Sequence, residues 1–281
     1  MFSEAMLIQI AENGDFITGD RVLEHASSLE DVEYFKIDYL FKSGTWRSEE
    51  FSIYEKNKFN GKTVVIGHSD IEFDYKAWLV FKLLKVRNVL ALNLGVSRKN
   101  HYALPLGVPE WMLTSRNEPT SENMIFRALH DISHDQSKIY YMYSNFSDST
   151  YSSLRVPLTK LIQKIPKIKK GMLDSSESGR YRYLTEIRKS HMVLCPRGNG
   201  IDTFRFWESL YLGSVPVVVE KDLPKGILDF DLPIVVLRNW EEITDTHLVQ
   251  RKYDQCRSIQ NKCDNLSFTF LKTYINQIIL S

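Results

Sequence analysis

The residues of this sequence best suited to chemistry lie in one loop of the second half. The run Pro196-Arg197-Gly198-Asn199-Gly200 follows a short apolar run and precedes a helical pattern that Asp202 or Thr203 would cap. Glycines permit backbone conformations that other residues resist. A helix start presents free N–H groups and the positive end of the helix dipole. The loop therefore predicts an anion-binding site.

Charged side chains around this loop make the prediction more specific. Arg197 in the loop and Arg205 in the helix carry forked guanidinium donors that suit phosphate oxygens. The helix from 204 to 212 is apolar around most of its circumference, so we expect it to be buried. Its ionisable groups are Arg205 and Glu208, and buried charges are costly unless paired. Either these two charges pair with one another, or Arg205 binds a diphosphate and Glu208 binds ribose hydroxyls.

A second strand end carries groups of the same kind. Asn145 and Ser147 follow an expected strand at 139–142, and the helix after them contains Arg155. Polar donors, a helix start and an arginine at a strand end again suit an anion. We expect these residues to extend the site, although Arg155 could equally be a surface residue of its helix.

The first half offers candidates for a general base. His68 and Asp70 directly follow the expected strand 63–66, and Glu72 lies close behind. A carboxylate or imidazole at a strand end that faces a cleft can remove the proton of a hydroxyl group. We prefer Asp70 and keep His68 and Glu72 as alternatives, while a turn-forming or helix-capping role for Asp70 is also open.

The elements that position these residues alternate between strands and helices. Such alternation is typical of an α/β protein with parallel sheets. The expected strands are 63–66, 89–92, 139–142, 192–194, 215–219 and 233–237. The expected helices are 74–86, 150–165, 203–212, 247–259 and 268–280.

A polar stretch from Thr114 to Glu122 separates two sets of strand–helix units. It predicts a first domain over 1–120 and a second over 121–265. Two such halves that face each other leave a cleft at the carboxyl ends of their strands, where open α/β sheets bind ligands.

Composition narrows the class of protein. A formal charge of +1 over 281 residues gives no support for wholesale binding to nucleic acid. Three cysteines without a framework suit a reducing compartment. No basic leader begins the chain, and no apolar run approaches the roughly 18 residues of a membrane span. These observations predict a cytoplasmic protein without a membrane span.

The segment 190–218 closely resembles the core motif of exostosin-like glycosyltransferases, and above all their small soluble bacterial and viral members. Weaker similarities extend over most of the second half, at Asn145-Phe146-Ser147, Arg155, Asp231-Leu232-Pro233 and Trp240-Glu241-Glu242-Ile243.

The resemblance implies a GT-B-like fold, in which two Rossmann-like halves face each other across a cleft. It implies that 1–120 is the acceptor side, that 121–265 binds a nucleotide sugar, and that the last helix, 266–281, packs back on the first half. The activity it implies is inverting transfer from a UDP-sugar, UDP-xylose being one candidate, to a hydroxyl of a glycan acceptor. Carried over by residue, the resemblance and the patterns above give this donor-binding set: Asn145, Ser147, Arg155, Arg197, Gly198, Asn199, Gly200, Asp202, Thr203, Arg205 and Glu208.

The sequence predicts no metal or other cofactor. Asp229-Phe230-Asp231 has the spacing of a metal-binding motif but precedes a strand, so we interpret it as a turn. Arginines and a helix dipole would then stabilise the departing diphosphate. Two alternatives to transfer stay open, a non-catalytic module that binds nucleotide sugars and a nucleotide-sugar epimerase.

Overall fold

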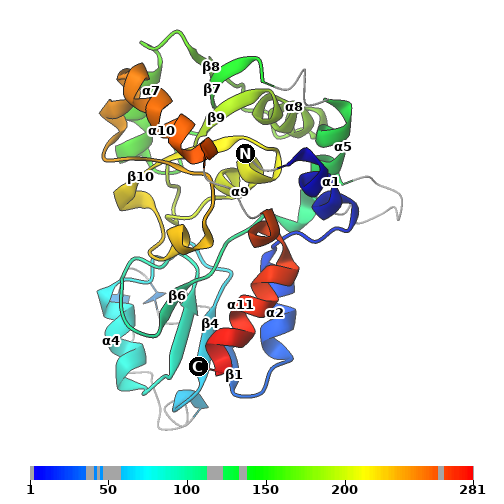
Figure 1. Ribbon diagram of the computed structural model, residues 1–281. Helices are drawn as coiled ribbons and strands as arrows, with labels where there is room; N and C mark the ends of the chain where they lie inside the picture. The colour runs from blue at the N-terminus through cyan, green and yellow to red at the C-terminus, as the bar shows by residue number, and fades with distance from the viewer. Residues whose placement is uncertain are drawn as a thin grey trace.

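The computed structural model describes residues 3–35, 41–42, 45–46, 58–112, 123–132, 138–258 and 263–280. These residues form two α/β halves, each built on a parallel sheet, which lie one above the other in Figure 1. Two such halves confirm the predicted α/β class with GT-B-like architecture. A short antiparallel pair, β2 (Phe41–Lys42) and β3 (Thr45–Trp46), stands apart from both sheets.

The sheet of the first half has the strand order β1-β4-β5-β6. Its strands are β1 (Val32–Phe35), β4 (Thr63–Ile66), β5 (Asn88–Ala91) and β6 (His101–Ala103). Successive side chains of a strand point to opposite faces. Val65 and Leu90 therefore pack in one core with α2 (Gly19–Ser27), while Val64 and Ile66 pack on the other face with α4 (Tyr75–Leu83).

The sheet of the second half has the order β11-β10-β9-β7-β8. Its strands are β7 (Tyr140–Ser144), β8 (Ile168–Lys170), β9 (Ser190–Leu194), β10 (Val215–Val219) and β11 (Val235–Leu237). One face packs on α5 (Met124–Asp131), α8 (Glu177–Arg188) and α9 (Phe204–Tyr211), and the other on α7 (Ser152–Ile162) and α10 (Thr246–Ser258). The buried valines of β10 and β9 make this sheet the apolar centre of the half.

Each end of the chain packs on the half remote from it in sequence. The first helix, α1 (Glu4–Glu12), lies in the second half, where Glu4 pairs with the buried guanidinium of Arg188 (Figure 1). The last helix, α11 (Phe268–Leu280), lies in the first half, and its Ile278 carbonyl accepts a hydrogen bond of 3.0 Å from Asn88 Nδ2 (Figure 1). These two crossings hold the halves together.

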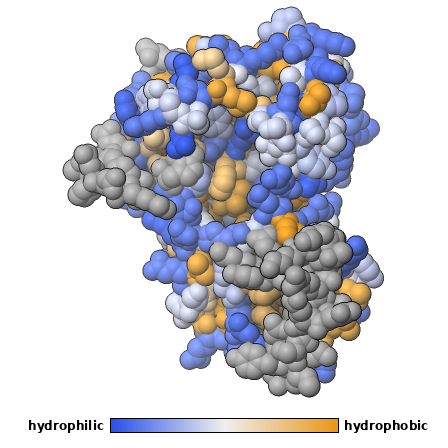
Figure 2. All heavy atoms as spheres, turned by 180° about the vertical axis from the view of Figure 1, so that it is seen from behind, coloured by the Kyte–Doolittle hydropathy of each residue, from blue (hydrophilic) through white to orange (hydrophobic). Residues whose placement is uncertain are grey.

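Short 3₁₀ turns complete the described chain: Glu110–Met112, Glu220–Asp222, Ile227–Phe230, Trp240–Thr244 and Cys263–Leu266. The predicted domain boundary near residue 120 falls within 113–122, outside the described residues, and stays a prediction. No helix in the described ranges has both the length and the apolar character that crossing a membrane requires. Seen from behind, apolar side chains gather near the junction of the two lobes (Figure 2).

Candidate active site

A cavity of about 430 Å³ opens between the halves, at the carboxyl ends of the strands. Asn145 follows β7, Gly198 follows β9, and Asp70 enters from the first half after β4. Ligands of open α/β sheets bind in this position because loops from several strands meet there. The cavity brings together most of the predicted site residues, namely Asn145, Arg155, Gly198, Asn199, Gly200, Asp202, Thr203, Arg205, Glu208 and Asp70.

Arg205 and Glu208 lie side by side on α9 but form no ion pair. The hydroxyl of Tyr183 on α8 donates to the Glu208 carboxylate, which is 4% exposed. Burial raises the pKa of Glu208, and the Tyr183 hydrogen bond and the charge of Arg205 offset part of that rise. Within the described structure, no side chain or carbonyl accepts a hydrogen bond from the Arg205 guanidinium, and its Nε is buried without a partner. Its donors are therefore available to a ligand in the cavity.

The start of α9 is open toward the cavity. Thr203 is its N-cap residue, with extended backbone, yet its side chain makes no capping hydrogen bond. Asp202 does not cap the helix either, because its carboxylate accepts hydrogen bonds from Trp207 Nε1 at 2.9 Å and from the Leu106 amide at 3.0 Å. The first N–H groups of α9 thus stay free of side-chain partners, which is the arrangement that binds anions at helix starts.

The glycine loop fits closely against the first half. The amide of Asp202 donates to Asn93 Oδ1 at 2.8 Å, and Asn93 Nδ2 donates to the Ser69 carbonyl at 2.8 Å. A Cβ atom at Gly200 would lie 2.6 Å from Asn93 Oδ1, so a side chain is excluded there. Asn93 therefore joins the loop of the second half to the strand end that carries Asp70.

Arg155 is buried, 5% exposed, and is not the surface residue that the sequence left open. Its guanidinium donates to three carbonyls, those of Ser147, Pro196 and Arg197, at 3.0, 3.2 and 2.9 Å. Burial and the charge of Arg205 lower the pKa of Arg155 to about 10. Arg155 thus fixes two loops of the cavity wall and presents a positive edge to the cavity.

Two predicted donor residues do not line the cavity. Arg197 turns to the opposite side of its loop, where Nη1 lies 3.3 Å from Glu72 and the guanidinium stacks 4.8 Å from the Tyr151 ring. Ser147 shares a hydrogen bond with Ser149 and contributes its carbonyl to Arg155. A direct contact of either side chain with the donor stays a prediction.

Helix α8 adds cavity residues that the sequence analysis missed. Arg180 and Tyr183 line the cavity, and Asp174 does so just before the helix. Arg180 and Tyr183 are three residues apart and share one face of α8. Their spacing could have predicted that both line the cavity. Helix α8 is so polar, however, that its amphipathic pattern is weak.

Among the base candidates, Asp70 has the most suitable position. It lines the cavity, is exposed, and makes no hydrogen bond or ion pair with the residues described. His68 already uses both ring nitrogens, Nδ1 with the Tyr34 hydroxyl and Nε2 with Asp20 at 3.2 Å. Glu72 is occupied by Arg197. The geometry therefore favours Asp70 as the group free to accept a proton.

Asp202 should make stability depend on pH. Burial raises the pKa of Asp202 from 3.8 to about 7, so the folded state holds a proton that the unfolded state releases above pH 4. The free energy of unfolding must then fall as the pH rises from about 4 to about 7, by at most about 1.4 kcal/mol per unit from this group. Asp202→Asn should lose that fall, so its deficit against the wild type should shrink by about 1 kcal/mol or more between pH 4.5 and 7.5.

Urea unfolding at both pH values measures this difference. Asp229→Asn, at an exposed carboxylate, is the matched control and should leave the pH slope unchanged. A deficit of Asp202→Asn that stays constant or grows with pH would show that Asp202 is ionised throughout this range.

Comparisons with known proteins find one family model that is similar to the second half of the chain. Residues 132–269 match a family model described as the RXYLT1 C-terminal domain. A comparison with curated protein sequences finds no match. A crystal structure of an α1,3-fucosyltransferase is similar over 97% of this chain and 87% of that chain, with 9% identity and a TM-score of 0.45. A second α1,3-fucosyltransferase structure, with GDP-fucose, is similar over 78% of each chain, with 10% identity and a TM-score of 0.38.

The matched residues include β9, the glycine loop and α9, which carry the cavity wall and the earlier resemblance. The match covers 138 of the 281 residues, just under half of the chain, and it supports the resemblance of this segment to the exostosin-like glycosyltransferases.

Proposed function

We propose that this protein is an inverting glycosyltransferase that moves a sugar from a UDP-sugar to a hydroxyl of a glycan acceptor. The observation that carries the proposal is the guanidinium of Arg205, which donates no hydrogen bond to the described residues and lies beside the open start of α9. Both face a cavity whose far wall, from the other half, holds the unpartnered carboxylate of Asp70. Such a cavity suits an anionic leaving group on one side and a proton acceptor on the other.

The donor would bind with its diphosphate at the start of α9. Backbone N–H groups and the helix dipole favour negative charge there, and Arg205 adds forked donors. The carboxylate of Glu208, one turn further along α9, would accept hydrogen bonds from the ribose hydroxyls. Arg155 and Arg180 add positive charge to the same wall. UDP is the nucleotide that the family resemblance implies, with UDP-xylose one candidate.

The reaction would be a single displacement. Asp70 takes the proton of the acceptor hydroxyl as that oxygen attacks the anomeric carbon. The bond from the anomeric carbon to the diphosphate oxygen breaks, the configuration inverts, and UDP leaves with the bonding electron pair. Arg205 and the α9 dipole stabilise the charge on the departing diphosphate, a task for which this proposal requires no metal ion.

A thermal-shift screen with UDP-, GDP- and TDP-sugars tests the donor. A ligand that binds only the native state raises Tm with its concentration, and at one hundred times Kd it adds about 2.7 kcal/mol, or about 5 °C for a chain of this size. We expect UDP-sugars to give this shift and GDP- and TDP-sugars a smaller one. Glu208→Gln should reduce the shift, because Gln presents a weaker acceptor to the ribose.

Product analysis then separates transfer from binding alone. Incubation of the best UDP-sugar with mixed oligosaccharides should release UDP and produce a glycoside of inverted anomeric configuration. Release of UDP-linked epimer without glycoside would support an epimerase. A Tm shift without any turnover would support a binding module.

A further inference from the structure

A second cavity adjoins the candidate donor site on the side of the first half. Its volume is about 410 Å³. Asp70, Leu106 and Phe204 line both cavities, so the two meet at the proposed base. A hydroxyl group held in the second cavity would therefore lie next to Asp70, with the donor sugar on its other side.

The two cavities differ sharply in charge. Arg155, Arg180 and Arg205 line the donor cavity. The second cavity has Asp70 and Glu110 in its wall, and of the residues that the structure describes no lysine or arginine lines it. Asp20 adds a third carboxylate behind this wall, 3.2 Å from His68 Nε2.

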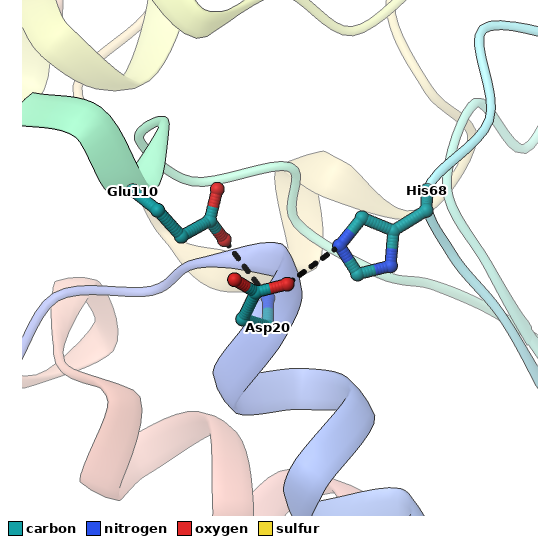
Figure 3. A group of neighbouring side chains, drawn as sticks. All are labelled: Asp20, His68 and Glu110. Carbon is teal, nitrogen blue, oxygen red and sulfur yellow. Dashed lines mark hydrogen bonds and ion pairs between the residues drawn. The ribbon is translucent and has the colours of Figure 1, made fainter. Parts of the chain in front are cut away.

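The start of α2 in this wall has no capacity left for an anion. Helix α2 begins at Gly19, and its N-cap Thr18 accepts a hydrogen bond from the Arg21 amide. The Glu110 carboxylate accepts a hydrogen bond of 2.9 Å from the Asp20 amide, and Figure 3 shows this contact. A carboxylate of the protein therefore already occupies the positive end of the dipole of α2.

The carboxylates of this wall are held in place. Asp20 lies between Glu110 and His68 in Figure 3, and the far nitrogen of His68 meets the Tyr34 hydroxyl. A Cβ atom at Gly19 would lie 2.7 Å from His68 Nε2, so the helix start fits directly against the imidazole. The members of the group Asp20, His68 and Glu110 (called the carboxylate wall below) are thus joined to one another.

We propose that the second cavity binds the acceptor, and that its carboxylate wall selects an uncharged, hydroxyl-rich sugar over a uronate or a sugar phosphate. The acceptor role rests on the proposed function. Carboxylates accept strong hydrogen bonds from sugar hydroxyls, whereas a second anion beside them meets like charge without a cation to offset it. The donor half attracts anions and the acceptor half excludes them, which also keeps a second nucleotide sugar out of the acceptor position.

Matched glycoside pairs test this selection. The full chain, with UDP at saturation, is titrated with p-nitrophenyl β-glucoside and β-glucuronide, and with the corresponding galactoside and galacturonide, in a calorimeter. Each pair differs only by a carboxylate in place of a hydroxymethyl group. We expect the neutral member to bind about tenfold tighter or more. Added NaCl should narrow the difference, because salt screens repulsion between exposed charges.

Glu110→Gln ties the selection to the carboxylate wall. Gln retains a carbonyl oxygen for the Asp20 amide and removes the charge. It should weaken binding of the neutral glycosides, because Gln is a weaker acceptor, and strengthen binding of the uronides, so that the preference for the neutral member falls several-fold. Glu24→Gln, at an exposed position of α2, is the control and should change neither neutral nor uronide binding. If Glu110→Gln lowers Tm, Asp70→Asn removes a charge that lines the same cavity and should likewise weaken the preference for neutral glycosides.

The outcomes separate this inference from the proposed function. Uronides that bind as tightly as their neutral partners, or a selection that persists unchanged in both charge-removing variants, would overturn it. So would the absence of any glycoside binding while UDP binds normally, and in that case the donor site stands. Absence of UDP binding would instead contradict the donor assignment, whatever the glycosides do.

Discussion

Replacing Arg205 with alanine should reduce kcat for sugar transfer by about 10²- to 10³-fold, about 2.7–4 kcal/mol of transition-state stabilisation. The guanidinium donates no hydrogen bond within the described structure, so its donors are free for the diphosphate, whose charge increases as the sugar departs. Because the interaction strengthens in the transition state, the loss should appear in kcat as well as in kcat/KM. Initial rates of UDP release and glycoside formation measure both.

The fold should survive this substitution. Glu208 keeps its hydrogen bond from Tyr183, so loss of Arg205 does not leave the carboxylate without a donor. Arg205→Lys keeps the charge but loses the forked pair of donors, so its kcat should lie between those of Arg205→Ala and the wild type. Arg251→Ala, on the exposed face of α10, is the matched control and should leave kcat and kcat/KM unchanged. If Arg205→Ala turned over at the wild-type rate, the start of α9 would not be the site that stabilises the departing diphosphate.

The second half could be predicted largely from local patterns. The strand 215–219 and the helix 268–280 have the predicted bounds in the structure. The loop at Gly198–Gly200 and the buried helix after it were also expected, because strand, glycine turn and helix start follow one another within a few residues. The donor cavity was predictable to the same extent, since it forms at these strand ends.

Long-range contacts account for what the sequence did not predict. Arg197 turns away from the cavity because its partner Glu72 lies in the other half, 125 positions away. Arg155 is buried because carbonyls of two loops converge on it. Helix α1 packs on the second half, where its apolar face is buried and Glu4 pairs with Arg188. No local pattern of residues encodes such pairings, which depend on how the elements pack.

The first half was predicted least well because it carries short, irregular elements and no matching family motif. Strand β1 has half-buried residues throughout, so it lacks both a buried run and an alternating pattern. The carboxylate wall combines α2, the loop after β4 and the turn at Glu110–Met112, which are far apart in sequence. Sequence spacing could suggest Asp70 as a base but could not show that His68 and Glu72 are engaged elsewhere.

Asp70 lines the cavity and forms no hydrogen bond or ion pair with the described residues, as a general base requires. Asp70→Asn should lower kcat for transfer by about 10²- to 10⁴-fold, the usual contribution of a general base. Asn is close in size to Asp and Asp70 is exposed, so the fold and the donor cavity should remain intact. The Tm shift produced by UDP-sugar should therefore equal that of the wild type, and initial rates of glycoside formation should show the loss.

Two further variants distinguish Asp70 from its neighbours. Glu72→Gln breaks the pair with Arg197 on the far side of the loop and should reduce kcat by less than about tenfold. His68→Gln removes an imidazole whose nitrogens are both engaged, so it should act through stability and the acceptor KM more than through kcat. If Asp70→Asn turns over normally while His68→Gln loses kcat with Tm unchanged, the imidazole is the base and its contacts with Asp20 and Tyr34 must open during the reaction. If both variants turn over normally, the proton acceptor lies elsewhere in the cleft and the arrangement of Asp70 between the two cavities has another purpose.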